Sequence, residues 1–506
     1  MGFRRRLIGT GVGIAAFVVS VLAMLPHGSY VGAILSALVV GVVLYDWRQK
    51  SNPLRRNYPL LGRLHDVTHF LGWFFGLKPR IAPFAPEILT LVQQRADGLA
   101  DISAFGAQLP QRLTIRHAIA SSDPKDVATS VVIGGEGCAC PYEASVLNIS
   151  ALAFGALSNA AIEALSRAAA QGGFLYNTGE AGLAPAFLRG GGDLIWQVGT
   201  GYFGCRDRDG AFDPAMFQER ARLDNIKMIE VKLSQGSKPA KGGYLPGEKV
   251  SAEVAEVCQI PMGVDSILSP RHSAFSNPVG LLEFLVRLRD LSGGKPVGFK
   301  LCVGQPRDLF AIGKAMIETE IFPDFISVDG SEGGTGAAPI EFQSFVGMPL
   351  VSGLAFVHQM LVGLGIRGQV RVLASGKIAT GADMVAAMVR GADVCMAARA
   401  FMIAMGCIQA LECGSNACPT GIATQNRRLS KAVMIGHQAE RIVRFHSATV
   451  ESFRALVAST GNTTAAALGP ELLGEPPYPI GPGQLLDGDI PAPFANDWEQ
   501  ASSKHF

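Results

Sequence analysis

The sequence has almost no net charge. Its 506 residues contain 44 Lys and Arg against 42 Asp and Glu, and only 17% of all residues are charged. A protein that binds nucleic acid neutralises phosphates with an excess of basic residues, and no such field extends over this chain. The composition therefore indicates that nucleic acid is not a partner.

Cysteines are also few and widely spread, with nine in the whole chain. A small secreted protein held together by disulfides has a much denser framework, so the sequence predicts a reducing compartment for its main domain. Cys138 and Cys140, separated by one residue, remain a candidate metal or redox pair. Neither an internal repeat nor a low-complexity tract is evident.

Two segments near the start contain no charged residue, residues 7–26 and 29–45. Each is close to the roughly 20 residues that a membrane-spanning helix needs. Arginines precede the first segment and basic residues follow the second, which favours cytoplasmic flanks. The pattern predicts a transmembrane helical hairpin over residues 1–50, two-pass in the inner membrane, with the catalytic domain in the cytoplasm. A cleaved signal peptide and a pair of buried core helices are the alternatives.

The hairpin is followed by a mixed flanking region, residues 51–143, with an aromatic stretch at residues 69–75 and a helical pattern at residues 86–99. At the other end, residues 431–506 are predicted to form a helical segment and a tail. The tail is rich in Pro and Gly from about residue 469, which predicts an extended course over the surface.

Between residues 144 and 430, short apolar runs that end in Gly, Ser, Asn or Asp alternate with helical patterns. This alternation is typical of parallel βα units. The candidate strands are residues 147–150, 174–177, 228–233, 265–269, 297–302, 325–329, 371–375 and 393–397. Eight units predict an α/β fold, a (β/α)8 TIM barrel, whose active site lies at the carboxyl ends of the strands. A doubly wound open sheet is the competing architecture.

Glycine-rich loops follow several of these strands. Residues 330–337 follow the sixth, residues 374–381 the seventh and Ala397-Ala398 the eighth. The loops after strands seven and eight are the usual phosphate site of this barrel, which favours a phosphorylated cofactor. Lys300 ends an apolar strand, where it would face an anion, an electron-rich ring or a salt-bridge partner inside the barrel.

Cys407, Cys413 and Cys418 form a C-x5-C-x4-C pattern just after the last strand. The loop between them contains Gly and Pro, so it can wrap a small metal–sulfide core held by thiolates. The spacing differs from the usual zinc patterns. Three buried thiols that pack as small apolar groups are the alternative.

Residues 145–425 resemble the FMN-binding domain of glutamate synthase, and the whole chain resembles the stand-alone, membrane-linked members of that family. The matching strings are residues 148–158 (NISALAFGALS), 177–180 (NTGE), 235–239 (QGSKP), 249–250 (KV), 329–330 (DG), 333–337 (GGTGA) and 413–425 (CGSNACPTGIATQ).

The resemblance implies an oxidoreductase that acts on CH–NH2 donors, with FMN at the barrel mouth and a [3Fe-4S] cluster on Cys407, Cys413 and Cys418. Hydride transfer from reduced FMN would convert the imine of 2-oxoglutarate, or of a related keto acid, into the amino acid. The catalytic residues that it implies are Glu180, Gln235 and Lys238. The cofactor-binding residues that it implies are Ser150, Ala151, Gln197, Lys300, Asp329, Gly333, Gly334, Thr335, Ser375, Gly376, Ala397 and Ala398.

Two positions depart from the glutamate-forming pattern. Tyr244 stands where the family has a Gln, and Cys258 where it has an Arg, and both changes remove donors for a dicarboxylate. No N-terminal glutaminase domain is expected ahead of the barrel, so glutamine-derived ammonia would need a partner subunit, as would the supply of electrons. The alternative function is an electron-relay flavoprotein module with a different amine substrate or none.

Overall fold

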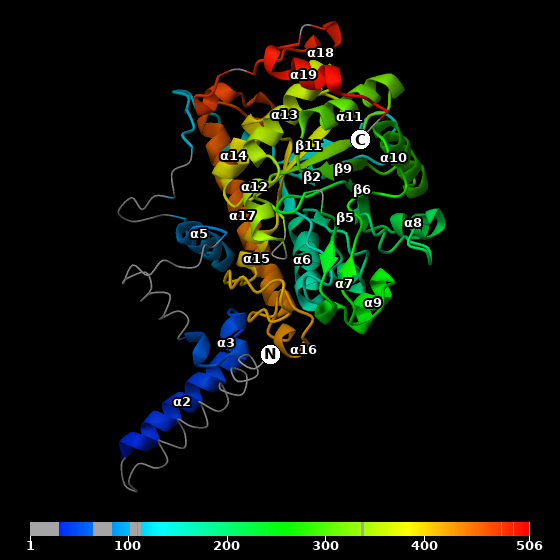
Figure 1. Cartoon of the computed structure of the whole chain (residues 1–506). Helices are drawn as coiled ribbons and strands as arrows, with labels where there is room; N and C mark the ends of the chain where they lie inside the picture. Colours follow the sequence, from blue (N-terminus) through cyan, green and yellow to red (C-terminus); the bar gives the residue numbers. More distant parts are fainter. Residues whose placement is uncertain are drawn as a thin grey trace.

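A computed structural model describes residues 30–63, 83–101, 109, 113–239, 241–334, 338–476, 478–488 and 490–504. Within these ranges the central element is a closed barrel of eight parallel strands, which confirms the predicted α/β barrel (Figure 1). Its strands, in the order in which they pair around the barrel, are β10 (Phe325–Asp329), β11 (Arg371–Ser375), β12 (Val394–Ala397), β3 (Leu147–Ile149), β4 (Tyr176–Asn177), β5 (Leu194–Val198), β6 (Ile226–Lys232) and β9 (Val297–Leu301).

One predicted strand is wrong and one was missed. Residues 265–269 were assigned to the barrel, but β8 (Ser266–Ile267) pairs antiparallel with β7 (Tyr244–Leu245) in a separate small sheet. The missing barrel strand is β5, which is buried along its whole length. A strand buried on both faces shows no alternation of polar and apolar residues, so periodicity does not reveal it. The two errors cancel in the count, and β11 and β12 remain the seventh and eighth strands.

Helices surround the barrel (Figure 1). Several begin at a side chain that accepts a hydrogen bond from the first turn, such as Ser158, Asn277 and Thr380, which satisfies amide groups that have no partner within the helix. The larger helices are α6 (Asn159–Gly172), α8 (Pro214–Ala221), α10 (Pro278–Ser292), α11 (Pro306–Thr319), α13 (Leu350–Gly363), α14 (Gly381–Val389) and α17 (Ile435–Ser459). The short ones are η2 (Pro124–Asp126), α7 (Pro185–Gly190), η3 (Gly247–Lys249), α9 (Ala252–Cys258), α12 (Ile340–Phe345), α15 (Arg399–Ala404), α16 (Arg427–Ser430), η4 (Ala465–Ala467) and η5 (Pro470–Leu473).

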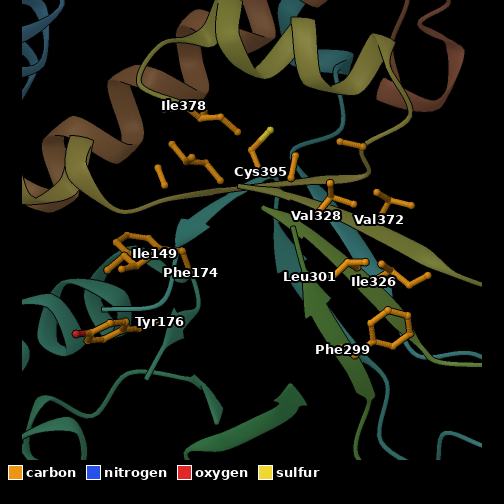
Figure 2. Close-up of a cluster of buried hydrophobic side chains, with 14 of the residues drawn as sticks. Ile149, Phe174, Tyr176, Phe299, Leu301, Ile326, Val328, Val372, Ile378 and Cys395 are labelled. Carbon is orange, nitrogen blue, oxygen red and sulfur yellow. The ribbon is translucent and has the colours of Figure 1, made fainter. Parts of the chain in front are cut away.

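Side chains alternate between the two faces of the barrel wall, so two separate apolar clusters form. Outward residues such as Ile149, Phe299 and Val372 belong to a large cluster that includes residues of the surrounding helices (Figure 2). Inward residues, including Met228, Phe325 and Leu373, form a small interior cluster with the hairpin of β1 (Ser130–Ile133) and β2 (Tyr142–Ser145). The carboxyl ends of the same strands instead place buried polar side chains in the interior.

The N-terminal part contains α2 (Tyr30–Arg48) and α3 (Pro53–Asn57), followed by α5 (Pro86–Asp97), which confirms the helical pattern predicted for residues 86–99. In the described ranges no helix combines the length and the apolar character that a membrane span requires. The predicted transmembrane hairpin is therefore unsupported by the structure. Its first segment, residues 7–26, and the aromatic stretch at residues 69–75 lie outside the described residues.

The C-terminal tail is less extended than its composition indicates. It contains α18 (Gln484–Asp487) and α19 (Ala492–Gln500). The Trp498 ring of α19 lies edge-on to Phe310 of α11, with 5.4 Å between ring centroids, and Lys314 Nζ donates to the carbonyl oxygens of Trp498 and Ala501. Apolar contacts with α11 therefore hold a segment whose Pro and Gly content gave no sign of them.

Three histidines whose pKa is lowered by burial predict a loss of stability in mild acid. Burial lowers the pKa of His272, His358 and His446 to about 4 in each case, whereas an unfolded histidine titrates near 6.5. Stability should be fully present above about pH 6.5 and fall as the pH drops toward 4, because the unfolded chain then binds more protons. The urea midpoint measured against pH should follow this course.

The matched variants are His446→Gln and His117→Gln. His446 stacks on Phe174 and its Nε2 lies 2.9 Å from the carbonyl oxygen of Leu147, whereas His117 is exposed. His446→Gln should flatten the decline between pH 6.5 and 4, and His117→Gln should leave it unchanged. Equal slopes in the two variants would contradict the prediction.

Candidate active site

A buried carboxylate connects three strands at the polar end of the barrel. Glu230 of β6 is 1% exposed. Its Oε1 accepts from Asn177 Nδ2 at 2.8 Å and from Gln197 Nε2 at 2.6 Å, and its Oε2 accepts from the hydroxyl of Ser327. With these donors, Glu230 fixes the ends of β4, β5 and β10 relative to β6.

Two residues further along β6, Lys232 turns toward a cluster of charges. Its Nζ lies 2.8 Å from Oε1 of Glu180. Burial raises the pKa of Glu180, but Lys232, Lys238 and Lys300 outweigh that effect and leave its pKa below the usual range. Glu180 is therefore ionised at neutral pH.

Lys238 is the cation in this cluster without a direct partner. Its side chain is 6% exposed, and in the described part of the chain no hydrogen bond or ion pair engages its ammonium group. Burial lowers its pKa, while Glu180 acts in the opposite direction. A buried cation is costly unless it meets an anion, so this position is suited to an anionic ligand.

The loop that carries Lys238 packs closely against the glycine-rich loop after β10. The Ser237 amide donates to the Ser331 carbonyl at 3.0 Å, and the Gly236 amide donates to Asp329 Oδ2 at 2.8 Å. A Cβ added at Gly236 would stand 1.9 Å from the Gly330 carbonyl oxygen. Only glycine permits this approach. Gln235, the third predicted catalytic residue, lies half-buried in the same loop.

Several of the predicted cofactor residues meet at the carboxyl ends of the strands. The Ser150 hydroxyl lies 3.0 Å from that of Ser375, and the Ser150 amide donates to the Ala397 carbonyl at 2.9 Å. Lys300 Nζ lies 3.5 Å from Asp329 Oδ2, the same oxygen that accepts from the Gly236 amide. These contacts join the ends of β3, β11 and β12, and those of β9 and β10.

The remaining predicted cofactor residues follow the same strand ends. Gly376 and Ala398 directly follow Ser375 and Ala397, and Ala151 follows Ser150. Gly333 and Gly334 lie in the loop after β10, where a Cβ at Gly334 would stand 2.2 Å from the Gly236 carbonyl oxygen. Thr335 lies outside the described residues.

The three cysteines after β12 lie close enough to influence one another. Burial, together with the smaller effects of Cys413 and Cys418, raises the pKa of the Cys407 thiol to about 12. Burial also raises the pKa of Cys413, against the effect of Lys249 and Arg399. All nine cysteines are free thiols, so these three are available as ligands.

Within the described ranges, no three His, Cys, Asp or Glu side chains are placed to hold a metal ion.

Cys138 and Cys140 lie at the other end of the barrel. Their thiols donate to the carbonyls of Gly294 and Gly293, which precede the start of β9. They are remote from the polar ends of the strands and take no part in the candidate site.

The two positions that depart from the glutamate-forming pattern supply no cation. Tyr244 is 43% exposed and its hydroxyl is 3.0 Å from Asp265 Oδ2. Cys258 is buried and its thiol donates to the Ala181 carbonyl. Neither contributes a positive charge for a second substrate carboxylate.

Glu230, Lys232 and Ser327 are site residues that were not predicted from the sequence. A signal was present for the first two, because charged residues two positions apart in a strand point to the same face. Ser327 gave no such signal, since a single serine in a strand is unremarkable.

Comparisons with known proteins agree on one family. The conserved region in glutamate synthase matches residues 111–463. The glutamate synthase large subunit-like protein YerD of Bacillus subtilis is 33% identical over 487 aligned residues, which cover 85% of this chain and 92% of that protein.

A second relative is matched over a smaller part. The archaeal glutamate synthase (NADPH) of Archaeoglobus fulgidus is 33% identical over 314 residues, which cover 62% of this chain and 58% of that protein. Among solved structures, a mandelate oxidase mutant with an FMN adduct aligns at a TM-score of 0.42 and 15% identity, over 75% of this chain and 89% of that one. This structural similarity is too low to support a conclusion.

The Glu230 network predicts contrasting effects of two substitutions. Glu230→Leu leaves two amide groups and a hydroxyl without an acceptor, at about 1–3 kcal/mol each, so unfolding free energy should fall by several kcal/mol. Glu230→Gln keeps an acceptor for the amides and lets the serine hydroxyl rotate to accept, so its loss should be about 1 kcal/mol. Urea unfolding measures both, and equal losses would contradict the assigned network.

Proposed function

Because the chain belongs to the glutamate synthase family of oxidoreductases, we propose that it reductively aminates 2-oxoglutarate or a related keto acid, or oxidises the corresponding amine. The observation that carries the proposal is the cluster of Glu180, Lys232 and Lys238 at the carboxyl ends of the strands. Its lysines suit a substrate carboxylate, and the Glu180 carboxylate suits a positively charged substrate nitrogen. Both of these substrate groups occur in the proposed reaction.

FMN is the cofactor that we propose for the barrel mouth, where it would supply hydride chemistry. Ser150, Ser375 and Ala397 lie in hydrogen-bond contact at the ends of three adjacent strands. The Gln197 side-chain nitrogen donates to Glu230. The Gln197 amide oxygen would then be the atom that accepts a hydrogen bond from the FMN ring system. Lys300 adds a buried positive charge close to Asp329.

The cysteine loop fits the [3Fe-4S] cluster that we propose as the second cofactor. Its thiols are close together, since Cys413 and Cys418 help to raise the pKa of Cys407 and Cys418 that of Cys413, and none of the three forms a disulfide. Lys249 and Arg399 add two positive charges, which suit an anionic assembly with three thiolates.

Substrate binding follows from the charges. Lys238, which has no direct partner in the described part, would take the carboxylate next to the reacting carbon, and a charge-assisted contact of this kind is strong. Glu180 would hold the nitrogen cation formed when ammonia replaces the keto oxygen with loss of water. Reduction then adds a hydride and a proton overall, and the reverse reaction removes them.

The substrate is best described as a small keto acid or amine. Tyr244 and Cys258 provide no donor cation for a distal carboxylate, so monocarboxylic keto acids compete with 2-oxoglutarate. We also propose partners that supply ammonia and electrons. The name of the archaeal relative includes NADPH, which is a donor of electrons.

A flavin test addresses the function directly. The purified full chain should show flavin absorbance that keto acid with ammonia restores after anaerobic reduction. Lys238→Met should raise the keto acid concentration needed for half-maximal reoxidation about tenfold or more, because about 1.4 kcal/mol of binding free energy corresponds to tenfold.

The matched control is Lys241→Met, because Lys241 is exposed and lies over the Phe342 ring. It should behave as the unaltered protein. Flavin that no keto acid reoxidises and no amine reduces would overturn the aminating function and favour the electron-relay alternative. Absence of flavin would overturn both.

Membrane attachment through the N-terminal segments is a further part of the proposal. It is supported by apolar side chains exposed along α2, including Ile34, Leu38 and Leu44, and by the basic residues that follow. The catalytic domain would then face the cytoplasm.

Substitutions on α2 test this attachment. Leu38→Glu with Leu44→Glu should move at least half of the protein from the membrane pellet to the supernatant after a high-salt wash. Ile340→Glu, at an equally exposed apolar position on α12, should leave the distribution unchanged. A full chain already found in the supernatant would contradict attachment.

A further inference from the structure

A lysine that does not belong to the group of Glu180, Lys232 and Lys238 is buried beside the cysteine loop, residues 407–418. Lys249, the last residue of η3, is 2% exposed. Its Nζ donates to the Cys413 carbonyl at 2.6 Å and to the Ala156 carbonyl at 3.0 Å. No carboxylate in the described ranges lies within ion-pair distance of it. Two carbonyls accept from two of its three N–H donors and leave its charge uncompensated.

A second hydrogen bond attaches η3 to the cysteine loop. Asn416 Nδ2 donates to the Glu248 carbonyl at 2.7 Å, so one bond runs from η3 to the loop and another runs back. Gln425 Nε2 donates to the carbonyls of Gly155 and Leu157, on either side of Ala156. The loop is therefore held by bonds that all converge near Lys249.

Lys249 is one of two cations that act on the cysteines. Both Lys249 and Arg399 lower the pKa of Cys413 against the effect of burial. The Arg399 guanidinium, however, donates to the carbonyls of Glu332 and Gly334 in the glycine-rich loop. Lys249 alone of the two donates to the backbone of a cysteine ligand.

Residues 243–249, which include η3, also approach Glu180. The Gly247 amide donates to Asp265 Oδ1 at 2.7 Å, and Asp265 Oδ2 lies 3.0 Å from the Tyr244 hydroxyl. A Cβ at Gly243 would stand 3.1 Å from Glu180 Oε1. Residues 243–249 thus extend from Glu180 to Cys413.

We propose that Lys249 is a positioning residue for the iron–sulfur cluster, acting as its buried counter-charge and anchoring the backbone of Cys413. This inference rests on the proposed function, which includes the cluster. Three thiolates make the cluster anionic, and reduction adds a further negative charge. A fixed cation therefore stabilises the reduced form more than the oxidised form and raises the midpoint potential.

The test compares Lys249→Gln and Lys249→Met in the full chain, purified anaerobically. Lys249→Gln keeps a donor for the carbonyls and removes the charge, so iron should be retained while the midpoint potential in an EPR-monitored titration becomes more negative. Lys249→Met removes both, so iron per chain should also fall. FMN content should not change in either variant.

Lys314→Met is the matched control. Lys314 Nζ also donates to two carbonyls, at 2.6 and 3.1 Å, but on α19. It should leave iron content and midpoint potential as in the unaltered protein. A shift of equal size in this control would show a general effect of losing a buried ammonium group and would overturn the proposal.

Iron in the unaltered chain and iron in the Lys249 variants test different parts of the proposal. No iron in the unaltered chain would refute the cluster itself. Iron present in the unaltered chain, with Lys249→Gln and Lys249→Met unchanged in iron content and midpoint potential, would refute the role of Lys249 alone. If neither variant folds, Asn416→Ala removes the other bond to η3 and should lower iron per chain with FMN retained. Unchanged iron in that variant would then overturn the proposal.

Discussion

The candidate site depends on the buried carboxylate of Glu230. It accepts hydrogen bonds from Asn177, Gln197 and Ser327, which lie on three different strands. In a barrel interior these donors would each be costly without an acceptor. One carboxylate satisfies them together, so the polar ends of β4, β5, β6 and β10 are held in a single arrangement. The charged residues one step further out, Glu180 and Lys232, are positioned on this base.

Two groups of positive charge are joined by one segment of the chain. Lys232 and Lys238 lie near Glu180, while Lys249 and Arg399 act on Cys413. Residues 243–249 connect the two groups: Tyr244 and Gly247 are bonded to Asp265, and Lys249 at the end of the segment donates to the Cys413 carbonyl.

The barrel could be predicted from the sequence because its signals are local. Apolar runs ending in polar residues and followed by helical patterns need no tertiary information, and the C-x5-C-x4-C spacing is visible in the chain itself. β5 was missed because a strand buried on both faces has no alternation. The pairing of Lys232 with Glu180, and of Lys249 with Cys413, joins residues 52 and 164 positions apart. Such contacts follow from barrel closure and loop packing, which no local pattern encodes.

The cysteine loop places protonated thiols beside a buried cation. Burial holds the pKa of Cys407 at about 12, so the thiol is protonated at neutral pH, whereas a metal ligand must be a thiolate. Burial also acts against the charged form of the nearby Lys249, because it lowers the pKa of the ammonium group, while Cys413 and Cys418 raise it. A cation without a counter-ion is destabilising in a dry interior, whereas a protonated thiol packs there as a small apolar group. Thiolates formed by loss of the thiol protons to a bound metal would supply the counter-charge that the Lys249 ammonium group lacks.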